Sequence, residues 1–179
     1  MNYYNQKQYI ARVNKKGEII GKIEKWEAHK LGILHQGFTI AVFYENHLIM
    51  QHRRHPAFDA TFDITISSHQ LFLNEKLQDT IDATYSALKR ELNITQNDLI
   101  SKPQKIGFVY YKAKDPKSEF TEHEIDAIVV VKVKRMPIPN YDFAYGLSLV
   151  KKSELSNKKS RIYESLAPWV KTMLSKNLL

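Results

Sequence analysis

Apolar and polar side chains alternate along much of this chain, and the alternation predicts a protein built largely from β-strands. Side chains on a strand point to opposite faces in turn, so a strand with one buried face is apolar at every second position. Residues 122–133 (EHEIDAIVVVKV) give the clearest signal, because an alternating first half runs into an almost wholly apolar second half. Similar patterns predict further strands at residues 3–13, 19–25, 38–44, 48–53, 64–69, 105–112 and 144–150.

Helical periodicity is confined to a few stretches of the chain. Residues 79–92 predict one helix, and residues 161–174 predict another near the end of the chain. Pro168 is expected to break or restart the second helix, because proline has no backbone N–H to donate. Residues 26–32 predict either a short helix or a loop.

Turn-forming residues at positions 14–17 and 45–47 predict two β-hairpins. Strands mixed with two or three helices indicate an α/β fold, in which helices cover a sheet. No repeat or shift in composition divides the sequence, so we expect one domain over residues 1–179. Its expected parts are an N-terminal hairpin (1–25), a core (about 35–150) and a C-terminal helix (about 161–175).

Composition restricts the chemistry. The 179 residues are 43% hydrophobic, contain no long apolar run and carry a formal charge of +8. The absence of cysteine excludes disulfides, thiolate metal ligands and a cysteine nucleophile. The positive charge favours phosphorylated partners, but the basic residues form no stripe with interleaved aromatics, so we expect no nucleic-acid partner. We also expect no membrane partner and a cytoplasmic location, because the start of the chain lacks the pattern of a secretory signal.

The stretch from residue 62 to 91 contains the most suggestive arrangement of reactive groups. Its predicted strand places Ser67 and His69 on one face, and its helix ends in Glu91. A hydroxyl group beside an imidazole, followed by a helical carboxylate, is typical of a functional site. Taken alone, a helical glutamate such as Glu91 is more typical of an ordinary surface position.

Candidate metal ligands lie on both sides of this stretch. Glu122 and Glu124 are two residues apart on a strand, so their carboxylates share a face, which is unfavourable unless a cation or proton lies between them. A solvated strand edge is the alternative. Together with His29, His35 and His69 they would form a set of three nitrogens and two oxygens, suited to Zn²⁺, Mn²⁺ or Fe²⁺. Each histidine alone is equally typical of a surface or core position.

Seven segments, in this order, resemble the Nudix-type isopentenyl-diphosphate isomerases and the Nudix hydrolases close to them. The segments are LHQGFTIAVF, LIMQHRR, FDITISSH, KREL, YYKAKDP, EHEID and APWVK. The resemblance covers roughly residues 17–171 and implies a Nudix-type α/β/α sandwich with a mixed sheet. It also implies a small-molecule diphosphate as the partner and leaves the oligomeric state open.

The resemblance implies a role for each matching residue. The transition-metal ligands would be His29, His35, His69, Glu122 and Glu124. Glu91 matches the carboxylate that holds Mg²⁺ against the substrate diphosphate. Glu124 also matches the family's catalytic glutamate, and Tyr111 its site tyrosine. The positions matching substrate-binding residues are Lys25, Arg53 and Trp169. An aromatic residue over the substrate's carbon skeleton has no clear match, and Tyr163 is the nearest candidate.

Ser67 occupies the position of the family's catalytic cysteine. Isomerisation requires one proton to be added to an alkene carbon and another to be removed on the opposite face of the substrate. A thiol with a pKa of about 8.5 exchanges protons near neutral pH, whereas a serine hydroxyl is a far weaker acid and needs a neighbouring base. A misplaced acid–base group costs on the order of 10²–10⁴ in rate.

The hydrolytic Nudix signature, G-x5-E-x7-R-E-U-x-E-E-x-G, is also poorly retained. Aligned on Glu91, its other defined positions are occupied by Phe72, Gln78, Ser86, Ala87, Arg90 and Asn93. We therefore expect a metal-dependent protein of the isomerase branch, which acts on isopentenyl or dimethylallyl diphosphate or a related small diphosphate by proton transfer. The alternatives are a Nudix diphosphate hydrolase with an altered site, or a non-catalytic diphosphate-binding module.

Overall fold

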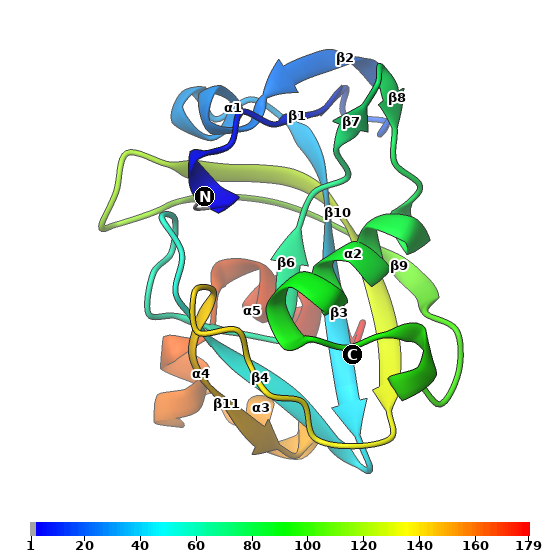
Figure 1. Cartoon of the computed structure of the whole chain (residues 1–179). Coiled ribbons are helices and arrows are strands. Elements are labelled where there is room, and N and C mark those ends of the chain that lie inside the picture. Colours follow the sequence, from blue (N-terminus) through cyan, green and yellow to red (C-terminus); the bar gives the residue numbers. More distant parts are fainter. Residues whose placement is uncertain (1–2) are drawn as a thin grey trace.

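Most strands of the protein join in one mixed sheet. The computed structural model describes residues 3–179 (Figure 1). In this part of the chain, nine strands form the sheet, and two more form a separate small hairpin. The strands of the sheet are β1 (Tyr9–Val13), β2 (Ile19–Glu24), β3 (His35–Tyr44), β4 (His47–Arg53), β5 (Phe62–Asp63), β6 (Ile66–Ser68), β9 (Gln104–Lys114), β10 (Thr121–Val133) and β11 (Ala144–Val150). The small hairpin is β7 (Phe72–Leu73) and β8 (Lys76–Leu77).

One parallel pair makes the sheet mixed. The strand order is β11-β4-β3-β1-β2, and β10 pairs with both β3 and β9. β10 runs parallel to β3, whereas the other paired strands of the sheet are antiparallel. The second half of β10 is apolar on both faces, as its sequence predicted, because α5 packs on one face of the sheet and α2 on the other.

Helices cover both faces of the sheet. They are α1 (Lys25–Leu31), α2 (Thr80–Leu92), α3 (Lys152–Leu155), α4 (Arg161–Ser165) and α5 (Pro168–Ser175), with 3₁₀ turns η1 (Tyr3–Asn5) and η2 (Gln96–Asp98). In Figure 1, α2 lies in front of the sheet and α5 behind it. The expected α/β/α sandwich with a mixed sheet is therefore confirmed.

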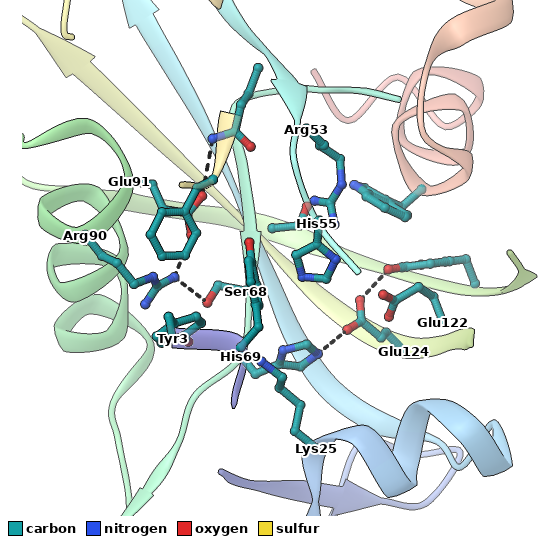
Figure 2. Close-up of a pocket in the computed structure, with 16 residues that line it drawn as sticks. Tyr3, Lys25, Arg53, His55, Ser68, His69, Arg90, Glu91, Glu122 and Glu124 are labelled. Atoms are coloured by element: carbon teal, nitrogen blue, oxygen red, sulfur yellow. Dashed lines mark hydrogen bonds and ion pairs between the residues drawn. The ribbon is translucent and has the colours of Figure 1, made fainter. Parts of the chain in front are cut away.

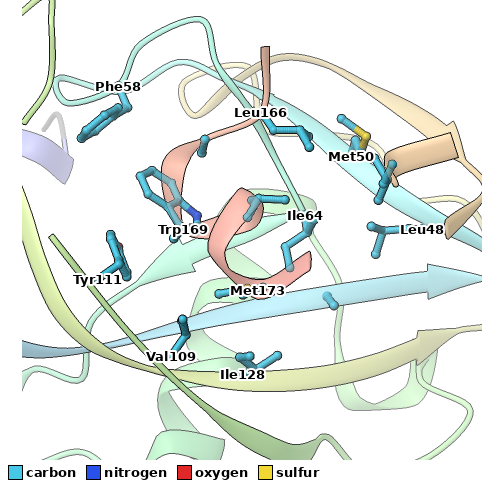
Figure 3. Close-up of a cluster of buried hydrophobic side chains, with 14 of the residues drawn as sticks. Leu48, Met50, Phe58, Ile64, Val109, Tyr111, Ile128, Leu166, Trp169 and Met173 are labelled. Carbon is cyan, nitrogen blue, oxygen red and sulfur yellow. The ribbon is translucent and has the colours of Figure 1, made fainter. Parts of the chain in front are cut away.

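Alternation along β3 and β10 divides the core into two clusters. Ile40 and Val129 point towards α2 and pack with Leu88 in one cluster. Ile128, the neighbour of Val129, lies in the other cluster with Trp169 of α5. Figure 3 shows this second cluster around α5. Since Glu122 and Glu124 share the parity of Ile128, they project from the α5 face of the sheet.

The sheet opens between β3 and β4. These strands pair only beside their turn, at Phe43–Leu48 and Tyr44–His47. Further along, β6 pairs with β3 while β5 pairs with β4, so the two strands lie apart. Groups from both faces can meet at this opening, which explains how α2 and β10 contribute to one pocket.

Several predicted boundaries need correction. The first strand begins at Tyr9, because Tyr3–Asn5 forms a 3₁₀ turn whose aromatic rings pack into the pocket described below. The strand expected at residues 64–69 is shortened to Ile66–Ser68, since Thr65 has a φ of 121° and leaves the extended conformation. Pro168 does separate two terminal helices, as predicted. No helix in residues 3–179 has the length and hydropathy needed to cross a bilayer.

Candidate metal centre and its pocket

Three histidines and two glutamates meet at one place in the fold. His29, His35, His69, Glu122 and Glu124 each offer a ligand atom, and these atoms all lie within 4.8 Å of one another. They come from α1, β3, the segment after β6, and β10. The structure thus brings together the five residues that the sequence suggested as transition-metal ligands.

Two of the histidine rings are held by backbone carbonyl groups. His29 Nδ1 donates to the carbonyl oxygen of Lys25 at 2.6 Å, and His35 Nδ1 donates to that of Ile33 at 2.7 Å. The Nε2 atoms then face the carboxylates, with His29 at 3.1 Å from Glu122 Oε2 and His35 at 3.2 Å from Glu124 Oε1. An Nδ1–H bond to a carbonyl oxygen fixes the tautomer that leaves Nε2 free as a metal ligand.

Strand register places Glu124 at the centre of this group. It lies opposite His35 on parallel β3 and opposite Tyr111 on antiparallel β9. Tyr111 donates its phenolic hydrogen to Glu124 Oε2, and His69 Nε2 lies 2.8 Å from Glu124 Oε1. Gly37 leaves room for the carboxylate, since a Cβ there would lie 2.6 Å from Glu124 Oε1.

Two buried atoms test whether the group fits a metal ion. His35 Nε2 and Glu122 Oε2 are buried and have no hydrogen-bond partner among residues 3–179. Buried polar atoms are normally paired, because an unpaired one retains its full desolvation penalty. A divalent cation between them would satisfy both atoms, and three imidazoles with two carboxylates suit a transition metal. The residues present therefore fit such an ion.

The electrostatic environment gives Glu124 and Tyr111 opposite protonation states. Burial opposes ionisation of Glu124, but the adjacent imidazoles of His35 and His69 outweigh it and hold the pKa of Glu124 well below its usual range. Burial, with the nearby Glu124 charge, raises the pKa of Tyr111 well above its usual value. The pair therefore consists of an ionised carboxylate and a neutral phenol at neutral pH.

Ser67 belongs to a chain of hydrogen bonds beside the cage. Its hydroxyl lies 2.9 Å from Thr39 Oγ1, directly across the β3–β6 pair. Thr39 Oγ1 in turn lies 2.7 Å from Asp126 Oδ2. Burial and the nearby Glu124 charge raise the pKa of Asp126 well above its usual value, so either hydroxyl of the Ser67–Thr39 pair can be the donor.

A small cavity lies over the cage and separates Glu122 and Glu124 from Glu91. Figure 2 shows Glu122 and Glu124 on one side, Arg90 and Glu91 on the other, and His69 between them. The cavity volume is about 30 Å³, enough for one or two water molecules. The predicted site residues that line it are Lys25, Arg53, Ser67, His69, Glu91, Tyr111, Glu122, Glu124 and Trp169. His29 and His35 lie beneath this lining as buried members of the cage.

Lys25 is a cationic group in the lining of this cavity. Its Nζ donates to Gln8 Oε1 at 2.8 Å and lies 4.3 Å from the centre of the Trp26 ring. Burial, with the nearby charge of Arg90, lowers the pKa of Lys25 to about 8. An anion in the cavity would favour the charged form of this lysine.

Arg53 and Trp169 share a buried partner, Asp63. Arg53 Nη1 donates to Asp63 Oδ2 at 2.8 Å, and Trp169 Nε1 donates to Asp63 Oδ1 at 3.0 Å. The guanidinium carbon of Arg53 lies 5.0 Å from the centre of the Trp169 ring. Arg53 Nε is buried without a partner among the described residues, so one donor remains for a ligand.

Glu91 is already paired on both oxygens. Arg90 Nη2 donates to Oε1 at 2.6 Å, and Gln51 Nε2 donates to Oε2 at 3.3 Å. The backbone carbonyls of both helix residues accept hydrogen bonds from Asn140, which holds this end of α2 in place.

Sequence reasoning missed much of the pocket lining. The additional residues are Tyr3, Tyr4, Gln51, His55, Ser68, Arg90 and Phe143. Arg90 carried the one available signal, since it replaces a glutamate of the Nudix signature directly before Glu91. Tyr163 is not among the residues that line the cavity, and its ring lies 5.7 Å from Lys171 Nζ.

Fold and site together define a Nudix-fold protein with a candidate transition-metal cage. No known family profile matches the sequence. Two curated relatives are isopentenyl-diphosphate Delta-isomerases of Aliivibrio fischeri, from strains MJ11 and ATCC 700601 / ES114. Each is 30% identical over 129 residues, which cover 69% of this chain and 68% of the relative. The chain therefore belongs to the isopentenyl-diphosphate Delta-isomerase family.

Solved structures support the fold independently. The Deinococcus radiodurans protein DR0079 superposes with a TM-score of 0.62 at 15% identity, over 89% of this chain and 91% of its own. A bifunctional NMN adenylyltransferase/ADP ribose pyrophosphatase from Francisella tularensis, complexed with AMP and a Mn ion, gives 0.54 at 15% identity. This second match covers 79% of the present chain and 40% of the Francisella chain. Identities this low bear on the fold alone.

Proposed function

We propose that this protein acts on isopentenyl or dimethylallyl diphosphate, or a closely related small diphosphate, by metal-dependent proton transfer. Family membership supports the substrate class, because the curated relatives carry the name isopentenyl-diphosphate Delta-isomerase. The single observation that supports the reaction is the position of Glu124. Its carboxylate belongs to the candidate metal cage and also accepts the hydrogen of Tyr111, at the edge of the cavity.

Glu124 and Tyr111 would move protons on one side of the substrate. The ionised carboxylate is a proton acceptor, and the neutral phenol is a donor within hydrogen-bond reach of it. A divalent transition ion held by the cage would supply a fixed positive charge beside the carboxylates. The imidazoles of His35 and His69 lie against one oxygen of Glu124 and keep the carboxylate in one orientation.

Ser67 would be the second acid–base group, on the other side of the substrate, and it would transfer protons less readily than a thiol. Its hydroxyl is held in a hydrogen bond with Thr39 at 2.9 Å. A serine hydroxyl in this state neither donates readily nor removes a proton without a base. We therefore expect slow isomerisation compared with relatives that have a thiol here.

Lys25 and Arg53 would hold the diphosphate. Both line the cavity, and an arginine donor without a partner suits a phosphate oxygen. Trp169 supports Arg53 through its ring and through the shared carboxylate of Asp63. The cavity must widen to admit a diphosphate, and the turn at Tyr3 and Tyr4 is the segment that covers it from the N-terminal side.

Deuterium incorporation tests the proposal. The metal-loaded protein is incubated with isopentenyl diphosphate in heavy water, and the substrate and product are examined by mass spectrometry. Formation of dimethylallyl diphosphate, or deuterium in recovered substrate, supports proton transfer. Release of phosphate from the diphosphate would instead identify a hydrolase. Thermal stabilisation by the diphosphate with neither result would identify a binding module.

A further inference from the structure

The surroundings of Glu91 bear on how a diphosphate would be held. The resemblance assigns to this glutamate a magnesium ion that bridges it to the substrate. Glu91 is buried, with a side chain 8% exposed, and each of its oxygens already accepts a hydrogen bond from a side chain. The closer bond comes from Arg90, its direct neighbour on α2.

The contact between Arg90 and Glu91 depends on tertiary packing around the Arg90 side chain. Consecutive side chains on a helix point about 100° apart, so they do not ordinarily face each other. Three other segments hold the Arg90 side chain against Glu91. Its guanidinium carbon lies 4.3 Å from the centre of the Tyr3 ring and 5.6 Å from that of Phe143, and Nη2 donates to Ser68 Oγ at 3.1 Å.

The donor set around Glu91 does not fit magnesium. Mg²⁺ requires about six oxygen ligands in octahedral geometry and is held by carboxylates, waters and phosphates. The helix offers one carboxylate, because the other acidic positions of the hydrolytic signature hold Gln78, Ala87 and Arg90. That carboxylate, Glu91, is paired with the Arg90 guanidinium at 2.6 Å. The positive charge of Arg90 would repel a magnesium ion at the same carboxylate.

We infer that the Arg90 guanidinium takes the place of magnesium and binds the substrate diphosphate directly. Arg90 lines the cavity, and its Nε is buried without a partner among the described residues. Glu91 then serves to position the guanidinium rather than to bind a metal ion. Together with Lys25 and Arg53, Arg90 gives the cavity three cationic groups. A planar guanidinium suits phosphate oxygens, because its donors form a fixed fork.

The inference rests on the proposed substrate class but not on the reaction. It is tested by calorimetric titration of the zinc-loaded protein with inorganic pyrophosphate, in buffers with and without magnesium. We expect the dissociation constants for pyrophosphate in the two buffers to differ by less than about threefold. A tenfold difference would correspond to about 1.4 kcal/mol of binding free energy. Binding that is lost in the magnesium-free buffer would overturn the inference.

Variants at position 90 make the test specific. Arg90→Gln should weaken pyrophosphate binding about 10–100-fold, the effect of losing charge-assisted hydrogen bonds. Arg90→Lys should restore part of the affinity, because an ammonium keeps the charge but not the fork. Lys89→Gln is the matched control, since it removes one positive charge from an exposed position of the same helix. Equal affinities for Arg90→Gln and Lys89→Gln would contradict the inference.

Arg90→Glu gives the reciprocal test. It restores two adjacent acids at the end of α2, and pyrophosphate binding should then depend on magnesium. Circular dichroism melts establish that each variant is folded. Magnesium-independent binding without deuterium exchange would refute the proposed reaction and leave this inference intact. Turnover combined with magnesium-dependent binding would support the proposed reaction and refute the inference on Arg90.

Discussion

Tyr111 and Glu124 face each other across the antiparallel β9–β10 pair, and the phenol donates its hydrogen to the carboxylate. The tyrosine is 6% exposed, so this hydrogen bond is shielded from water. It joins the candidate metal cage to the cavity, and in the proposed reaction Tyr111 would pass a proton to Glu124.

Tyr111→Phe tests this pair, since it removes the hydroxyl and keeps the ring. We expect deuterium incorporation to fall on the order of 10²–10⁴-fold, the range for loss of an acid–base partner. Stability should fall by about 1.5–3 kcal/mol, the range for a hydrogen bond to a charged group. Tyr110→Phe is the control, because that exposed hydroxyl contacts His123 on the other face of β10. Equal losses in both variants would exclude a specific role for Tyr111.

Ser67→Cys should raise isomerisation. A thiol has a pKa of about 8.5, so it exchanges protons near neutral pH far more readily than an alcohol. The rate of dimethylallyl diphosphate formation measures the effect. Ser86→Cys, at an exposed position of α2, controls for unspecific thiol chemistry. An unchanged rate in Ser67→Cys would show that the lost activity extends beyond this one side chain.

Metal binding should stabilise the folded chain. An ion that binds only the folded state adds about 2.7 kcal/mol at a concentration one hundred times its dissociation constant. Zn²⁺ or Mn²⁺ titrations followed by thermal unfolding measure this gain. Glu122→Gln should lose most of it, because it weakens one ligand of the cage. His47→Ala, a histidine of β4 that is not part of the cage, should keep it. If added metal leaves the melting temperature of the wild-type chain unchanged, the five residues do not bind a metal ion.

Asp63→Ala should be strongly destabilising. Asp63 is the buried counter-ion of Arg53, and removal of one partner of a buried ion pair costs about 3–5 kcal/mol. It also accepts hydrogen bonds from Trp169 Nε1 and from the backbone N–H of Ile64. Urea denaturation measures the loss. Asp142→Ala, at an exposed position, should have little effect, and a similar loss there would argue against the ion pair as the cause.

Asp115 should make stability depend on pH in the acid range. Burial opposes its ionisation, but hydrogen bonds from Ser118 Oγ and from the N–H groups of Lys117 and Phe58 outweigh it and lower its pKa. A lowered pKa in the folded state means that the stabilisation is present above the usual value of 3.8. It is lost as the pH falls through the folded-state pKa, because the unfolded chain binds the proton more readily.

Asp115→Asn should therefore flatten this acid response. Urea denaturation at a series of pH values from about 2 to about 6 covers the window in which a carboxylate titrates. The wild-type chain should lose more free energy of unfolding towards low pH than the variant. Parallel pH curves for the two proteins would show that another carboxylate controls the acid response.

The strands and the main helices could be predicted from local patterns, because alternation and helical periodicity are set by which face is buried. The strand at residues 122–133 and the helix at residues 79–92 agree with the structure to within one residue at each end. Resemblance then identified the members of the cage. Spacing alone did not, since His35 meets Glu124 through the parallel pairing of β3 with β10, and His29 reaches Glu122 from α1, which packs against β10.

Other features depend on contacts that local sequence does not encode. Arg90 turns back onto Glu91 because Tyr3, near the start of the chain, and Phe143, directly before β11, pack on it. The hydrogen bonds from Ser67 through Thr39 to Asp126 require three strands in register. The aromatic residues at positions 3 and 4 followed a strand pattern, yet they form a turn whose rings cover the cavity.

The parallel pairing of β3 with β10 also has a consequence for folding. Parallel strands are joined by long connections, and contacts between distant segments form slowly because closing a long loop costs entropy. His35 and Glu124 become neighbours only when this step is complete. A chromophoric metal ion such as Co²⁺ added during refolding should then report the arrival of the central strand pair in real time. The cage would serve as a built-in indicator that this strand pair has formed.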